Sequence, residues 1–281
     1  MVAIRGLTVV RPIYCARAIG AGPIARSWRW VGALPRSRLT GAAMSVAIAA
    51  LAMGSWVGGA IALPPEEIDR KLESVPIFVV TDRDGNPVPI AVADRQGVEQ
   101  AVLRGFANPD EAIAFLEQVR GAEDSGTPDE ALVTSPLSLA GLFLLSRQDG
   151  AAYRVQLVPD ETALRAARIL LERSGQDPAR ARGLPLFLLT AGPDDDRTYV
   201  VAENDAGEEF IRFYMDADMA IDAVEAFQAA VPELGGTVRI EVLNLEELLK
   251  ELVEREDDWL RQVEIVPSAA AIAALDAAQE P

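Results

Sequence analysis

The chain has 281 residues, of which 50% are hydrophobic, and a formal net charge of −17 at pH 7. Residues 1–65 contain seven arginines and no lysine or acidic residue, so all 43 acids lie downstream with only 19 of the 26 basic residues. This acidity argues against nucleic acid and anionic membranes as partners, because both are bound by clustered Lys and Arg. Its simplest role is to keep the protein soluble.

Residues 1–62 are predicted to be an Arg-rich extension followed by a cleavable signal peptide. Arg36 and Arg38 precede an apolar stretch over residues 41–63 that ends in an A-x-A motif closed by Ala62. A charged region, an apolar region and this motif, in that order, are typical of secretory signal peptides, so cleavage is expected after Ala62. A retained membrane anchor is the alternative for the same stretch. No later apolar run is long enough to span a membrane, so no stable insertion is expected after cleavage.

Residues 1–33 make the charged region unusually long for a signal peptide. An error in the assigned start codon would explain this length. An organelle transit peptide is the alternative, because such peptides are rich in Arg and poor in acids.

The rest of the chain predicts an internal duplication with a period of about 108 residues. The run V-P-I-F-V-V-T from Val75 returns as L-P-L-F-L-L-T from Leu184, and Val155–Pro159 returns as Val263–Pro267. Chance does not keep one offset across separate segments, and a missed repeat would give the wrong fold. The expected parts are a lead-in helix over 63–74, a first repeat over 75–173, a linker over 174–183 and a second repeat over 184–281.

Each repeat is predicted to follow the order βββαβαβα. Short apolar runs bounded by turn residues favour strands, and Asn108-Pro109-Asp110 is typical of a helix start. In the first repeat, strands are expected at 77–80, 90–92, 101–106, 131–134 and 155–158, with helices beginning near 108, 139 and 160. The second repeat has strands at 186–190, 199–201, 210–214, 237–243 and 263–266, with helices near 216, 245 and 268. This pattern indicates an α+β fold in which helices cover a mixed sheet.

The chain lacks the residues that most enzymes and metal sites use. It has no histidine, and its one cysteine, Cys15, falls in the predicted leader. Histidine-dependent triads, thiol chemistry and most zinc sites are thereby excluded. The acidic runs at 81–87 and 192–197 do not fit the EF-hand pattern and are predicted to be hairpin turns. We therefore expect no catalytic residue, no metal and no cofactor, although a pair of carboxylates could still support glycoside hydrolysis.

The order of these motifs, together with the signal peptide and the duplication, resembles one protein family. V-P-I-F near residue 75, L-P-L-F near 184 and the closing V-x-I-V-P at 263–267 carry the resemblance, which extends from Leu63 to about Asp276. The chain is similar to the cyanobacterial relatives of the small intermembrane-space subunit of the chloroplast inner-envelope translocon, the Tic complex.

The resemblance implies a non-enzymatic, two-winged, pseudo-symmetric α+β protein with apolar grooves. Its location would be the periplasm, or the plastid intermembrane space if the N-terminus is a transit peptide. It would escort unfolded preproteins or outer-membrane β-barrel precursors and meet their assembly machinery. A structural adaptor that docks one fixed envelope partner is the alternative, and a carboxylate-dependent hydrolase is a further one.

A holder of unfolded chains needs concave apolar surfaces, and duplication would supply two of them on one chain. The candidates are leucines on the predicted helix faces, namely Leu139, Leu142, Leu245 and Leu248. Plain core packing is the alternative for all four. Arg104 and Arg212 recur at matched strand positions and could pair with acids or contact a client.

Overall fold

The computed structural model describes residues 63–281 except 94–98, 122–131, 147–152, 195–196, 205–207, 256 and 280–281. The predicted cleavage after Ala62 therefore lies outside the described residues. Within them, no helix is both long and apolar enough to cross a bilayer.

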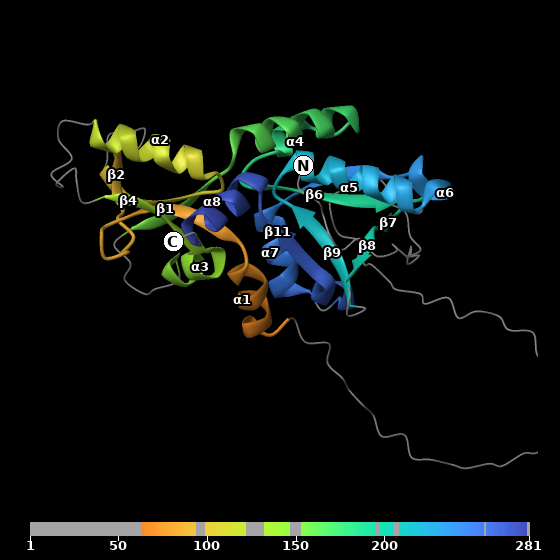
Figure 1. The fold of residues 1–281 in the computed structure, drawn as a ribbon, viewed down its shortest axis with the longest axis horizontal. Helices are drawn as coiled ribbons and strands as arrows, with labels where there is room; N and C mark the ends of the chain where they lie inside the picture. Colours follow the sequence, from red (N-terminus) through yellow and green to blue (C-terminus); the bar gives the residue numbers. More distant parts are fainter. Residues whose placement is uncertain are drawn as a thin grey trace, which may run out of the picture.

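The first half builds a five-stranded sheet and four helices (Figure 1). The strands are β1 (Pro76–Thr81), β2 (Ile90–Ala93), β3 (Glu99–Phe106), β4 (Val133–Ser138) and β5 (Arg154–Val158). The helices are α1 (Pro65–Glu73), α2 (Pro109–Arg120), α3 (Leu139–Ser146) and α4 (Glu161–Arg173). The predicted start of α2 is confirmed, because the Asn108 side chain accepts a hydrogen bond from the Asp110 N–H at 2.9 Å.

The second half builds a six-stranded sheet. Its strands are β6 (Pro185–Ala191), β7 (Thr198–Tyr199), β8 (Val201–Glu203), β9 (Glu209–Tyr214), β10 (Arg239–Asn244) and β11 (Val263–Val266). Its α-helices are α5 (Ala217–Ala230), α6 (Pro232–Gly235), α7 (Leu245–Glu254) and α8 (Ala269–Gln279), and the 3₁₀ turns are η2 (Pro178–Arg180) in the linker and η3 (Asp258–Gln262). The sequence did not predict α6 or either 3₁₀ turn.

Both sheets use the same strand pairings. The central strand β1 lies antiparallel between β3 and β4, and β5 lies parallel to β3. In the second sheet, β6 lies antiparallel between β9 and β10, and β11 lies parallel to β9. The predicted mixed α+β fold is confirmed, while the internal duplication stays a prediction.

Strand β4 corrects a predicted boundary. The sequence indicated a strand over 131–134, whereas β4 covers Val133–Ser138 and includes Pro136. Proline usually ends a strand because it lacks an N–H. Here it is tolerated because β4 is an outer strand of the sheet, where a backbone nitrogen can face away from the neighbouring strand.

The last helix of each half packs on the other half. Helix α4 contacts β6 and β10 of the second sheet, where Ala167 and Leu171 join Phe187 in one cluster. Helix α8 contacts α2 of the first half, and its Ala271 packs with Phe78. Helices α2, α4, α5 and α8 together form what we call the helix layer. Figure 1 shows α2, α4 and α5 along one side of the molecule.

The opposite faces of both sheets share one large core with α1, α3 and α7. Ile77 of β1 and Leu186 of β6 are each fully buried in it. Helix α1 also closes one edge of the second sheet, because Lys71 Nζ donates to the carbonyl oxygens of Arg261 at 2.7 Å and Val263 at 2.9 Å. The two halves are therefore joined through the core on one side and through the exchanged helices on the other.

Candidate functional site

The four candidate groove leucines lie in the core. Leu139 and Leu142 on α3 and Leu245 and Leu248 on α7 are each 0 or 1% exposed and belong to the cluster that joins the two sheets. The cause is local: each helix begins directly at a strand end, and the Leu139 N–H still donates to Val75 O at 2.8 Å. The equivalent bond joins Leu245 N to Leu184 O at 2.8 Å. The structure thus places these residues as core and not at the wall of an open groove.

The two matched arginines have different neighbours. Arg212 Nε lies 2.7 Å from Glu264 Oε2, its opposite residue on β11. Burial lowers the pKa of Arg212, but the hydrogen bonds and charges of Glu264 and Tyr214 together raise that pKa above its ordinary value. The sequence-predicted pairing with an acid is therefore met at Arg212.

At Arg104 the residue opposite on β5 is Gln156 instead of an acid. Its guanidinium carbon lies 4.8 Å from the ring centroid of Phe115, a cation–π contact. Its Nε is buried and has no hydrogen-bond partner among the described residues. The first half thus holds an arginine that lacks the acid of its counterpart.

The turn after β1 is built as predicted for its acidic sequence. Asp82 Oδ1 accepts hydrogen bonds from the backbone N–H of Asp84 at 2.9 Å and Asn86 at 2.8 Å, and Gly85 adopts a positive φ of 83°. Hydrogen bonds from Asn86 hold the pKa of the Asp82 carboxyl below its ordinary value. Across the described residues, no group of three or more His, Cys, Asp or Glu side chains is placed to hold a metal ion.

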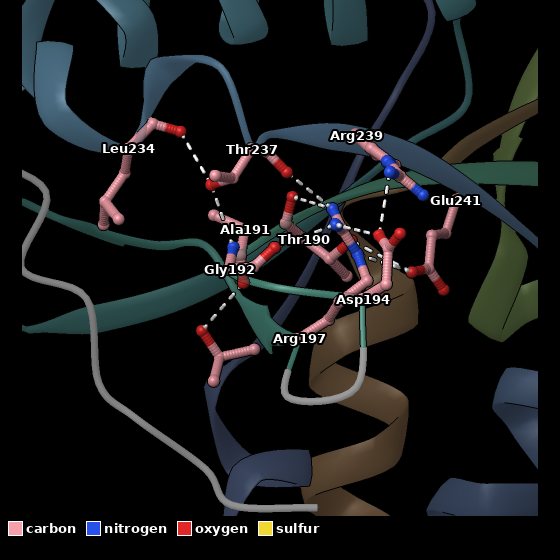
Figure 2. A network of polar contacts seen from close by, with 10 residues as sticks. Thr190, Ala191, Gly192, Asp194, Arg197, Leu234, Thr237, Arg239 and Glu241 are labelled. Atoms are coloured by element: carbon pink, nitrogen blue, oxygen red, sulfur yellow. Dashed lines mark hydrogen bonds and ion pairs between the residues drawn. The ribbon is translucent and has the colours of Figure 1, made fainter. Parts of the chain in front are cut away.

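Figure 2 shows a polar network around Arg197 that the sequence did not predict. Arg197 is only 5% exposed and follows β6. It donates to Thr190 Oγ1 at 3.0 Å, Thr190 O at 2.9 Å, Gly192 O at 3.1 Å and Thr237 O at 2.9 Å. These bonds tie the end of β6 to the segment before β10, and they occupy the guanidinium with backbone and hydroxyl acceptors.

Two carboxylates complete the Arg197 network. Glu241 Oε1 lies 3.6 Å from Arg197 Nε and accepts from Thr190 Oγ1 at 2.9 Å, and Asp194 Oδ1 lies 3.7 Å from Arg197 Nη1. Burial lowers the pKa of Arg197, and its charge is balanced by these acids. This arrangement ties the turn after β6 to the neighbouring strand β10.

In the described part of the first sheet, the positions matched to Arg197 and Glu241 are the uncharged Val88 and Ser135. There Thr81 Oγ1 lies 2.8 Å from Ser135 Oγ, and Val88 packs with Leu116 and Leu132. Thr81 and Thr190 occupy matched positions of β1 and β6. The two ends of the molecule therefore differ in chemistry although their strands are arranged alike.

Large apolar side chains are exposed on the helix layer. Ile113 on α2 is 46% exposed and Ile221, which follows it by 108 residues on α5, is 47% exposed. Ile169 on α4 and Ile272 on α8 are 44% and 38% exposed. Helix α8, which carries Ile272, packs beside α2, and helix α4, which carries Ile169, packs beside α5. The layer offers apolar surface in both halves, which makes it the candidate binding surface of the described chain.

Comparisons with known proteins place the chain in a family context. Residues 26–276 match the Tic22-like family. Anabaena Tic22, described as a protein of protein transport, is similar in structure, with a TM-score of 0.65 and 23% identity over 78% of this chain and 99% of that one. Tic22 from Plasmodium falciparum gives a TM-score of 0.52 and 19% identity over 74% and 96% of the two chains. No curated protein sequence matches the chain.

Proposed function

Because the chain belongs to the Tic22-like family, we propose that it takes part in protein transport as a holder of unfolded exported polypeptides, including outer-membrane β-barrel precursors. The proposed location is the periplasm, or the plastid intermembrane space if residues 1–33 are a transit peptide. The description of Anabaena Tic22 as a protein-transport protein supports the general role. The absence of histidine and of any cysteine after Cys15 supports a role without catalysis.

The observation that carries the proposal is the pair of exposed isoleucines, Ile113 and Ile221, at matched positions of the helix layer. Single exposed apolar residues are common on proteins, but a repeated placement on equivalent helices supplies two similar surfaces. An unfolded barrel precursor has apolar residues at alternating positions and meets such surfaces at many points. Two weak contacts on one chain raise the overall affinity when both engage together.

The matched strand pairings of the two sheets also support our proposal that the halves arose by internal duplication. On this view, the holder kept one binding surface per half. The acidic remainder of the chain would keep a protein with such surfaces in solution.

The test is suppression of aggregation of a urea-denatured outer-membrane barrel by the full chain. The double variant Ile113→Asp/Ile221→Asp should lose most of the suppression, because a charge on each surface repels apolar segments. The matched control is Leu144→Asp/Val253→Asp on α3 and α7, whose side chains are 58% and 49% exposed but lie outside the helix layer. The control should suppress as the wild type does.

A wild-type chain that gives no suppression at molar excess would sink the proposed role. Crosslinking in cells separates the holder from an adaptor: many exported partners support a holder, whereas a single stoichiometric envelope partner supports an adaptor.

A further inference from the structure

The outer strands β4 and β10 differ at one matched position in whether the backbone can donate a hydrogen bond. The N–H bonds of Leu139 to Val75 O and of Leu245 to Leu184 O fix the phase of both ladders. Along an outer antiparallel strand, residues whose backbone N–H and C=O bond to the neighbouring strand alternate with residues whose backbone groups point away from it. Pro136 and Val242, opposite Phe78 and Phe187, therefore both turn their backbone away from the sheet.

Pro136 blocks the first of these edges. It costs no ladder bond at an outward position, and it removes the donor from the middle of β4, a common way to prevent strand pairing at an edge. Val242 keeps its N–H and is a strong strand former. Among the described strands, β10 pairs only with β6, so Ile240 and Val242 direct two donors and two acceptors outward.

A hollow of about 270 Å³ runs along this edge of β10. It is lined by four consecutive strand residues, Arg239 to Val242, and by residues of α4 and of the turn after β6, among them Leu170 and Asp194. Successive strand residues point to opposite faces of a sheet. A hollow that touches all four therefore surrounds the edge itself and does not lie on one face.

The two walls of the hollow differ in polarity. Ile240 and Val242 pack with Leu170 in the cluster under α4, so this wall is apolar. Arg239 and Glu241 point to the other face, where Arg239 pairs with Asp194 and Glu241 with Arg197, so that wall is charged. A strand laid against the edge would place alternate side chains against the apolar and the charged wall.

We infer that the free edge of β10 binds an extended polypeptide segment of alternating apolar and polar residues as an added strand. This inference rests on the proposed function, in that the segment belongs to an unfolded client. Backbone hydrogen bonds to Ile240 and Val242 give the affinity, and the two walls select the alternation. Alternation of this kind is what strands of outer-membrane barrels carry. At the end of β10, the Asn244 side chain donates to Arg180 O at 3.1 Å.

The direct test titrates the full chain against a fluorescein-labelled nine-residue peptide in which valine alternates with threonine, read by fluorescence anisotropy. Val242→Pro should weaken binding at least tenfold, because it reproduces at β10 the block that Pro136 forms at β4. Val242→Ala removes more side-chain bulk than Val242→Pro but keeps the N–H, and should weaken binding less than threefold. Equal binding by wild type and Val242→Pro overturns the inference.

A second measurement uses only the wild-type chain and so does not depend on whether Val242→Pro folds. A copy of the peptide with every backbone nitrogen methylated keeps its side chains but cannot pair as a strand, and should not bind. The unmethylated peptide should slow hydrogen exchange at the Ile240 and Val242 amides. Binding of the methylated copy, or unchanged exchange at both amides, overturns strand addition.

Two further outcomes separate the alternatives. A wild-type dimer in sedimentation that Val242→Pro converts to monomer, without peptide binding, makes a second copy of the chain the occupant and overturns the inference. A wild-type chain that binds the peptide but fails to suppress barrel aggregation overturns the proposed function and leaves the edge site standing. A wild-type chain that suppresses barrel aggregation but does not bind the peptide overturns the edge site and leaves the proposed function standing.

Discussion

Substitution of Arg197 by valine should be one of the most destabilising single changes in the chain. The guanidinium makes four hydrogen bonds to groups at the junction of β6 and β10, and the residue is 5% exposed. A net value of about 1 kcal/mol for each bond gives about 4 kcal/mol. The same figure lies within the roughly 3–5 kcal/mol lost when one partner of a buried charge pair is removed. The melting temperature should fall by roughly 10 °C, since about 1 kcal/mol shifts a domain of this size by 2–4 °C.

The assay is urea denaturation followed by circular dichroism, with Arg197→Lys as the charge-conserving control. Lysine keeps the charge but cannot reproduce the planar fork, so it should recover only part of the loss. The double variant Arg197→Val/Glu241→Ser places a serine hydroxyl beside Thr190, as Ser135 lies beside Thr81 in the first sheet. It should be more stable than Arg197→Val alone, because it also removes the Glu241 carboxylate, which the single variant leaves without its cation. A loss below about 1 kcal/mol for Arg197→Val would refute the reasoning.

Three further changes test other parts of the structure. Gln156→Glu places an acid opposite Arg104, as Glu264 stands opposite Arg212. It should raise the free energy of unfolding by up to about 1 kcal/mol in low salt. No gain, or a gain that salt does not reduce, contradicts the pairing. Leu248→Ala should cost about 2–5 kcal/mol in urea denaturation because the side chain is 0% exposed, and a cost below 1 kcal/mol would mean that it is not core. The pKa of Asp82 is lowered by hydrogen bonds from Asn86, so its contribution to stability is present above its ordinary pKa and lost as pH falls through the folded-state value. Thermal melts across pH 2–6 should show a smaller acid loss for Asp82→Asn than for the wild type, and identical slopes would contradict this assignment.

Local signals in the sequence predicted much of the secondary structure. The apolar runs near Val75 and Leu184 became the fully buried central strands β1 and β6. Asn108 and Pro109 marked the start of α2 correctly. These features depend on neighbours along the chain, so a single sequence is enough to read them.

Long-range features were not predictable in the same way. The apolar stripe of α4, with Ala163, Ala167 and Leu171, indicates that one face is buried but not which sheet covers it. Arg197 follows an acidic turn and is indistinguishable, by spacing alone, from a solvated arginine. Its burial depends on carbonyl groups brought together from β6 and from the segment before β10. The candidate leucines failed as groove residues for a related reason, because an apolar helix face reads alike whether a core or a ligand covers it.

The exchange of α4 and α8 also sets an order of events during synthesis. The first sheet is complete once β5 has emerged from the ribosome, yet the helix that packs beside α2 is α8, the last helix of the chain. Phe78 and Ala112 must wait for Ala271, which is synthesised more than a hundred residues later. The first half therefore cannot close this surface until the end of the chain has been made, whereas α4 is already present when the second sheet forms.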